Sequence, residues 1–145
     1  MMQQELSVQG LVELASAFYG SAILFSALEN NVFTQVEKLG PAATLENLAK
    51  TGGMDLRGLR LLLDACVAIG ILAKDEEIYR NTDAGTAALV SGSKMDLSRA
   101  VLYNRDVYPA WGKLSALVKS GKPVEAPEIH LGEDLERTRR FVLSM

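Results

Sequence analysis

The stretch "ASAFYGSAILFSALE", Ala15 to Glu29, constrains the fold more than any other part of the sequence. Charged residues make up 23% of this 145-residue chain, yet none lies between Glu13 and Glu29. Such a segment needs a cover, which is a membrane, the core of its own domain or a second protein chain. Each cover predicts a different kind of protein.

The run itself disfavours a membrane. Crossing about 30 Å of hydrocarbon takes roughly 20 apolar residues, whereas this run is shorter and contains Ser16, Gly20, Ser21 and Ser26. The residues before it carry no basic group, which a secretory signal would have. We therefore expect a cytoplasmic protein without membrane contact.

Composition narrows the class of protein. Hydrophobic residues make up 48% of the chain, which predicts one ordered domain over residues 1–145. The net charge of −3 gives no reason to expect nucleic acid as a partner. Cys66 is the only cysteine, which excludes an internal disulfide and a cysteine-rich zinc site. We expect its thiol to pack in a helix core.

Capping residues and apolar spacing predict a mainly α fold. Ser7 is a suitable N-cap for a helical region over residues 8–30, whose apolar side chains lie on nearly every side. That distribution is typical of a helix that is buried all round. Gly20 and Ser21 are expected to bend or split the helix.

Residues 44–92 follow the order of a winged helix. Thr44 and Asp55 are N-caps for two helices joined by Gly52 and Gly53, which predicts a helix-turn-helix. Two short β-prone pieces then flank a charged turn, and a further helix follows. We expect a winged helix-turn-helix with a small β-hairpin as its wing.

Extra helices are expected at both ends of this core. Beyond the N-terminal region 8–30, the apolar spacing predicts C-terminal helices over residues 96–145. Pro109 should kink or break the first of them. A loop is expected at Lys122–Gly132, and a last helix after it.

A winged helix suggests DNA binding, but the charges disfavour it. The second helix of the motif offers Arg57 and Arg60 together with Asp55 and Asp64, and the wing turn carries the acidic run Asp75–Glu77. Binding to phosphates requires basic helices and wings. We expect no nucleic acid partner, and a standalone winged-helix DNA-binding transcription regulator remains the alternative function.

Catalytic motifs are missing. The sequence has no glycine-rich loop after a strand, no His-Glu-x-x-His helix and no evident nucleophile paired with its only histidine, His130. A lone histidine in a loop is more often incidental than catalytic. We predict no catalytic, cofactor-binding or metal-ligating residue in this chain.

Three stretches of sequence together resemble a known family. Thr44–Gly85 contains "LENLA", a glycine turn, "LRGLRLLLDACVAIGIL", an acidic wing and "YRNTDAG". "YPAWGKLSALVKSGKP" (Tyr108–Pro123) has a Trp-x-x-Leu helix followed by Gly-x-Pro, and "RRFVLSM" (Arg139–Met145) has Phe-x-x-x-Met. The chain is similar to the N-terminal dimerisation domain of SAM-dependent small-molecule O-methyltransferases, which include plant phenylpropanoid and bacterial polyketide enzymes. It departs from the family at "VEAPEIHLG", where the usual pocket loop differs.

The resemblance implies a homodimer and a substrate-lid role in an O-methyltransferase that acts on a small aromatic or polyketide-like hydroxyl acceptor. The chain ends where the family's catalytic domain would begin, so we expect the catalytic domain to be absent. This chain alone should bind no cofactor and transfer no methyl group. The parent protein would use SAM.

Two sets of residues follow from the resemblance. One set is expected at the dimer interface, although a single-chain core would explain the same residues: Leu14, Phe18, Ile23, Leu24 and Phe25. The other set is expected to face the acceptor pocket, although aromatic side chains at helical spacing are commonly ordinary core: Tyr19, Tyr108, Trp111, Phe141 and Met145.

Overall fold

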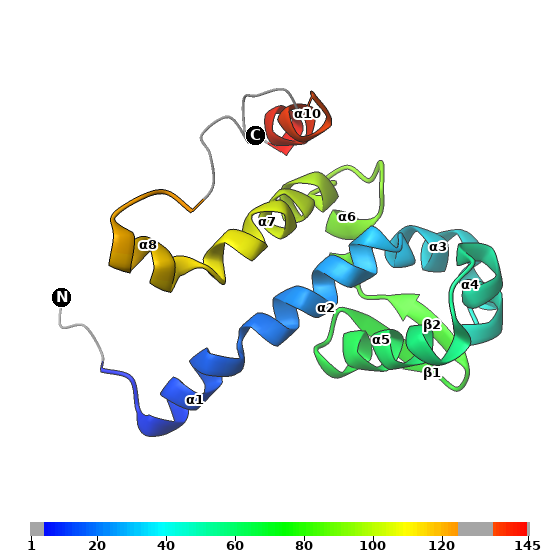
Figure 1. The fold of residues 1–145 in the computed structure, drawn as a ribbon. Coiled ribbons are helices and arrows are strands. Elements are labelled where there is room, and N and C mark those ends of the chain that lie inside the picture. The colour runs from blue at the N-terminus through cyan, green and yellow to red at the C-terminus, as the bar shows by residue number, and fades with distance from the viewer. Residues whose placement is uncertain (1–4, 125–134, 145) are drawn as a thin grey trace.

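The computed structural model describes residues 5–124 and 135–144 (Figure 1). Its helices are α1 (Val8–Ser16), α2 (Phe18–Glu29), α3 (Val32–Leu39), the 3-10 turn η1 (Gly40–Ala42), α4 (Leu45–Gly52), α5 (Leu56–Ala68), α6 (Asp83–Leu89), α7 (Ser98–Trp111), α8 (Leu114–Ser120) and α10 (Leu135–Ser144). The strands are β1 (Leu72–Asp75) and β2 (Ile78–Asn81). The predicted fold class is confirmed: it is mainly α, with a helix-turn-helix, a small hairpin and extra helices at both ends.

Four helices begin at N-cap residues, and the sequence predicts three of them, Ser7, Thr44 and Asp55. The side chains of Ser7, Thr44, Asp55 and Thr82 each accept a hydrogen bond from the backbone N–H three residues on, at 2.7 to 3.3 Å. Each bond satisfies a donor that the first turn of a helix leaves free. Local chemistry therefore sets where α1, α4, α5 and α6 start.

The helix-turn-helix and the hairpin form one unit. Gly53 has φ +62° in the turn between α4 and α5, a left-handed conformation that glycine adopts without steric cost. Strands β1 and β2 are antiparallel, with Leu72 opposite Asn81. The Tyr79 N–H of β2 donates to the Ala43 carbonyl at 2.9 Å, which ties the wing to the start of α4.

The hydrophobic core lies at one end of the molecule, where α3, α4, α5 and the hairpin surround the C-terminal half of α2 (Figure 1). Its largest fully buried side chains are Tyr79, Phe33, Leu48, Leu63, Val32 and Cys66. The expectation that Cys66 packs in a helix core is confirmed, because its residue is 0% exposed. Burial raises the pKa of this thiol to about 11, so it is held neutral.

The N-terminal helical region breaks at Ala17, so the expected break at Gly20 and Ser21 is wrong. The Ser16 hydroxyl donates to the carbonyls of Val12 and Glu13, and the Ala17 N–H donates to the Leu14 carbonyl at 3.4 Å. A serine that bonds back to the preceding turn bends a helix in this way. Gly20 and Ser21 continue within α2.

The prediction of a helix buried all round is also wrong for a single chain. Helix α1 has no buried residue, and in α2 only Phe25, Ala27 and Leu28 are buried. Among the residues that the structure describes, the core therefore leaves most of the uncharged stretch exposed.

Length alone does not exclude a membrane either, contrary to the sequence argument. Helices α1 and α2 together cover Val8–Glu29, a stretch of 22 residues that is long and apolar enough to cross a bilayer, and 17% of its most apolar window is buried. A core helix or an interface helix of a protein in water passes the same test. The charged and polar groups on this helical stretch decide between lipid and protein as its cover.

The C-terminal helices pack beside α2. Helix α7 contacts both α2 and α10 (Figure 1). Pro109 lies in the last turn of α7, and the helix ends two residues later at Trp111, which fits the predicted break. Of the predicted loop at Lys122–Gly132, only the first three residues are among those described, and His130 lies outside them.

Candidate functional site

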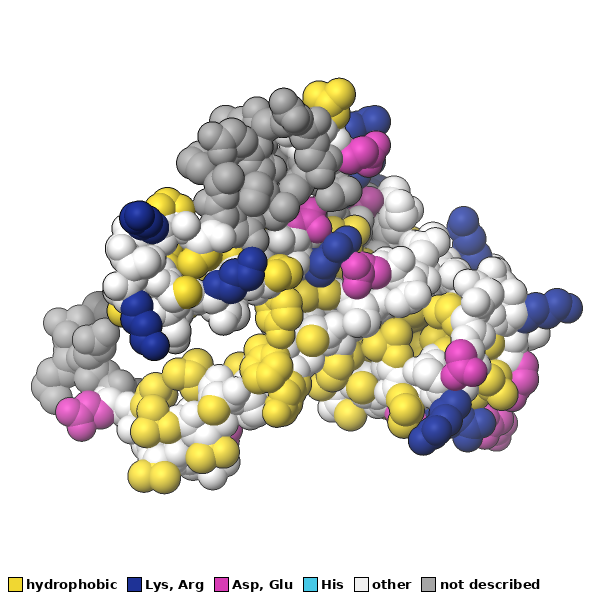
Figure 2. Space-filling view, viewed as in Figure 1, with side chains coloured by type: hydrophobic (Ala, Val, Ile, Leu, Met, Phe, Trp, Pro, Cys, Tyr) yellow, Lys and Arg dark blue, Asp and Glu magenta, His cyan; other side chains and the backbone are white. Residues whose placement is uncertain are grey.

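An apolar segment projects from the core at the N-terminal end. We call residues 5–19 the N-terminal arm. Figure 1 shows it extending away from the core, and Figure 2 shows hydrophobic side chains along it. Its large apolar side chains are 47 to 81% exposed: Leu6, Val8, Leu11, Val12, Leu14, Phe18 and Tyr19. So many exposed apolar groups in one place mark an interaction surface.

The five residues predicted at the dimer interface divide into two groups. Leu14 and Phe18 lie on the N-terminal arm and are exposed. Ile23 and Leu24 are half-buried against the hydrophobic core, and Phe25 is 9% exposed. The two groups differ because α2 begins in the N-terminal arm and then continues toward α5 and α7, both of which it contacts. The first two are therefore open to a partner, and Phe25 is covered by its own chain.

A groove lies at the junction of α7 and α8. Its volume is about 300 Å³, and its lining is mostly apolar: Val107, Ala110, Trp111, Leu114, Leu117, Pro123 and Val124. The Trp111 side chain is 68% exposed, so a flat face is available to a ligand. An apolar groove of this size suits a small aromatic molecule.

The structure does not bring the five predicted pocket residues together. Trp111 lines the groove. Tyr108 lies on the same helix, but its ring packs edge-on against Phe25. Tyr19 is on the N-terminal arm, and the centroid of its ring lies 4.4 Å from the ring centroid of Phe18. Phe141 lies in α10, where only its backbone is described, and Met145 is outside the described residues.

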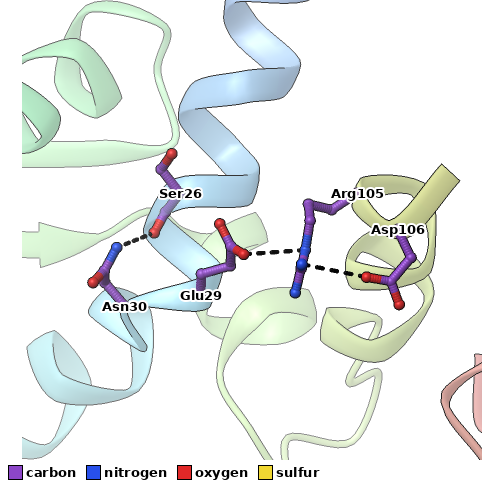
Figure 3. A network of polar contacts seen from close by, with 5 residues as sticks. All are labelled: Ser26, Glu29, Asn30, Arg105 and Asp106. Carbon is purple, nitrogen blue, oxygen red and sulfur yellow. Dashed lines mark hydrogen bonds and ion pairs between the residues drawn. The ribbon is translucent and has the colours of Figure 1, made fainter. Parts of the chain in front are cut away.

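An ionic link that the sequence alone does not predict holds α7 against α2. Arg105 Nε lies 3.1 Å from Glu29 Oε1, and its Nη1 lies 3.4 Å from Asp106 Oδ1 (Figure 3). The Asp106 side chain is 7% exposed. Next to this link, Asn30 Nδ2 donates to the Ser26 carbonyl at 2.8 Å and closes the end of α2. The opposite charges are visible in the sequence, but their pairing across two distant helices is not.

The described residues do not fit a SAM site. The strands among them form one antiparallel hairpin, whose turn carries Glu76 and Glu77. Nowhere in the sequence are two glycines separated by one residue, as a dinucleotide-type phosphate loop requires. No step of methyl transfer is therefore assigned to these residues.

The wing also lacks free cations for DNA within the part of the chain that is described. Lys74 lies 3.6 Å from Glu77, and Arg80 lies 3.2 Å from Asp75. Both cations are thus beside carboxylates of the same hairpin. These carboxylates offset the positive charge of Lys74 and Arg80 at the place where a wing would contact DNA phosphates.

Comparison with known proteins agrees with this geometry. Acetylserotonin O-methyltransferase of Mus musculus is 32% identical over 139 residues, which cover 91% of this chain and 35% of that protein. The tetracenomycin polyketide synthesis 8-O-methyl transferase of Streptomyces glaucescens is 33% identical over 114 residues, which cover 77% of this chain and 33% of that protein. The chain thus spans about a third of these relatives.

Solved structures show the same fold. Human N-acetylserotonin methyltransferase in complex with SAM superposes with a TM-score of 0.80 at 25% identity, over 99% of this chain and 46% of that one. An O-methyltransferase family protein from Burkholderia thailandensis superposes with a TM-score of 0.79 at 26% identity, over 98% and 42%. Residues 12–91 match the family model of the O-methyltransferase dimerisation domain. The chain belongs to this dimerisation domain family of the SAM-dependent O-methyltransferases.

Proposed function

We propose that this chain is the homodimerisation and substrate-lid module of a SAM-dependent O-methyltransferase whose acceptor is a small aromatic or polyketide-like hydroxyl compound. The observation that carries the proposal is the N-terminal arm, which exposes large apolar side chains that its own core does not cover. A second copy of the chain gives these side chains the cover that they need.

Charge supports a protein cover over a lipid cover. Glu13 lies within α1, where it would enter the hydrocarbon of a bilayer. Ser16 and Ser21 add polar groups to the same helical stretch. A protein interface accommodates such groups at its rim. We therefore propose a homodimer in the cytoplasm, without membrane contact.

The groove beside Trp111 supports the acceptor class. Its apolar lining and the exposed indole suit a planar ring. The relatives are named for acetylserotonin and for a tetracenomycin polyketide. The SAM site and the catalytic groups would then belong to a part of the parent protein outside this sequence.

The test is the solution mass of the chain, measured by light scattering over a dilution series. The proposal expects the mass of a dimer, and it expects Phe18→Asp to give a monomer with an unchanged circular dichroism spectrum. The change at Phe18 is informative because its side chain is 47% exposed in a single chain. Leu61→Asp on α5 is the matched control, since Leu61 is also exposed, and it should remain dimeric.

Two results would contradict the proposal. A wild-type monomer at all concentrations would remove the homodimer. Tight binding to random duplex DNA that weakens steeply with salt would favour the transcription regulator instead. The paired cations of the wing and the family membership both argue for the methyltransferase module.

A further inference from the structure

A second pocket lies in the core region, between the end of α3, the turn η1 and strand β2. We call it the η1–β2 pocket, and its volume is about 280 Å³. The residues that matter below are Val36, Glu37 and Pro41 on one side and Tyr79, Arg80 and Asn81 on the other. Figure 1 shows α3 and β2 at the opposite end of the molecule from α1 and α8. The η1–β2 pocket is therefore separate from the N-terminal arm and from the Trp111 groove.

The Glu37 carboxylate is held in one orientation in this pocket. Its Oε2 accepts hydrogen bonds from Asn81 Nδ2 at 3.0 Å and from the Thr86 hydroxyl at 3.3 Å. Asn81 Nδ2 also donates to the Phe33 carbonyl at 2.9 Å, and because both of its partners are acceptors, the amide cannot be reversed. Both donors use the same oxygen of Glu37. No donor among the described residues reaches Oε1, which stays available.

The carboxylate also lacks a cation. Within the described part of the chain Glu37 forms no ion pair, although Lys38 follows it directly, and Arg80 lies 3.2 Å from Asp75 instead. Glu37 stands in the last turn of α3. The carbonyl end of a helix favours a cation and disfavours an acid. The carboxylate and the helix end thus both favour a positively charged ligand.

The polar and apolar groups of the pocket define the shape of that ligand. Asn81 Oδ1 is buried and accepts no hydrogen bond from the described residues, so acceptors outnumber donors on this wall. Val36 and Tyr79 are 2 and 1% exposed and form the inner, apolar side. The volume is just below that of pockets for drug-sized ligands. The pocket therefore suits a small molecule that carries N–H donors on an apolar body.

We propose that the η1–β2 pocket binds a small primary amine in its protonated form, with the ammonium group at Glu37 Oε1 and the apolar body against Val36 and Pro41. An ammonium group is a compact charge with three donors, which one free oxygen can bind. The planar fork of a guanidinium needs two free oxygens, and Oε2 already accepts two hydrogen bonds. The inference does not depend on the proposed homodimer or on the acceptor groove.

A pair of ligands tests the site in the unmodified 145-residue chain. Benzylamine is protonated at pH 7, and benzyl alcohol has the same ring without the charge. We expect benzylamine to give saturable shifts of the Glu37, Arg80 and Asn81 backbone signals in ¹H–¹⁵N NMR spectra, with a dissociation constant of about 1 mM. Benzyl alcohol should bind about fivefold more weakly. Added salt should weaken only the binding of benzylamine.

A neutral variant tests the role of the carboxylate. Glu37→Gln keeps an acceptor for Asn81 and Thr86 and removes the charge, so it should lower the affinity for benzylamine about fivefold and leave that for benzyl alcohol unchanged. Glu46→Gln is the matched control. Glu46 is an exposed acid in the first turn of α4 that does not line the pocket, and its loss should leave benzylamine binding unchanged.

Several results would overturn the inference. Equal affinity for the two ligands, or shifts that do not saturate, would show that the pocket does not select an ammonium group. An equal loss in Glu46→Gln would indicate a general effect of charge. Tighter binding of Nα-acetyl-lysine amide than of benzylamine would assign the pocket to a lysine side chain of another protein. The ligand pair decides the matter even if Glu37→Gln alters α3, because it uses the unmodified chain.

Discussion

The ring of Phe25 on α2 meets the ring of Tyr108 on α7 edge to face, with the ring centroids 5.8 Å apart. One turn further along α2, Glu29 forms the ion pair with Arg105 of α7. An apolar and an ionic contact thus join the same two helices. The N-terminal arm continues from α2, so it leaves the molecule next to this joint (Figure 1).

Truncating Phe25 should loosen this joint. Phe25→Ala removes a buried ring and leaves a cavity, so we expect the free energy of unfolding to fall by about 3 to 5 kcal/mol. Urea unfolding followed by circular dichroism measures the change. Tyr108→Phe keeps the ring contact and is the control. A loss below 1 kcal/mol for Phe25→Ala would mean that α7 is not held by this contact.

Arg105 should matter more for stability than a surface arginine. Arg105→Met keeps much of the apolar stem but removes the cation that lies beside Glu29 and beside the buried carboxylate of Asp106. A buried carboxylate with less compensating positive charge near it costs free energy in the folded state. We expect a loss of about 1 to 3 kcal/mol in the free energy of unfolding.

The matched control for Arg105 is Arg80→Met. The Arg80 and Asp75 side chains are 60 and 68% exposed, and exposed pairs contribute about 0 to 1 kcal/mol. Urea unfolding of the two variants under the same conditions compares them directly. Equal losses would show that the ionic link between α2 and α7 has no special role.

The sequence predicts the elements better than it predicts their surroundings. Caps such as Thr44 and Asp55 act within one helical turn, so their effect can be read from the neighbouring letters. The cover of a helix depends on distant elements, which is why α1 was expected to be buried and is exposed. The helix break at Ala17 depends on a hydroxyl rotamer of Ser16, which the sequence does not specify.

The candidate site was predictable only in part, for the same reason. Trp111 and Phe18 stand at exposed ends of their helices, and the family resemblance identified both. Tyr108 has the same aromatic character, but its side chain turns toward Phe25. The resemblance indicates the helix, whereas packing against α2 decides which way the ring faces.

Asp96 should make stability depend on pH through the segment that joins α6 to α7. Its carboxylate accepts hydrogen bonds from the Gly92 N–H at 2.8 Å and from the Ser98 N–H at 3.0 Å. Partial burial pushes the pKa of Asp96 upward, but these hydrogen bonds and that of the Ser98 hydroxyl outweigh it, so the pKa lies below its ordinary value.

A lowered pKa in the folded state means that the ionised carboxylate stabilises the fold. This contribution is fully present above the unfolded pKa of about 3.9 and is lost as the pH falls through the lower folded pKa. Asp96→Ala should therefore reduce the free energy of unfolding by about 1 kcal/mol at pH 7, and the difference from wild type should shrink below about pH 4. Asp96→Asn, which keeps an acceptor oxygen without the charge, should lose less. Urea unfolding at pH 7, 5, 4 and 3 measures this trend, and a difference that stays constant over the series would mean that the Asp96 charge does not stabilise the α6–α7 connection.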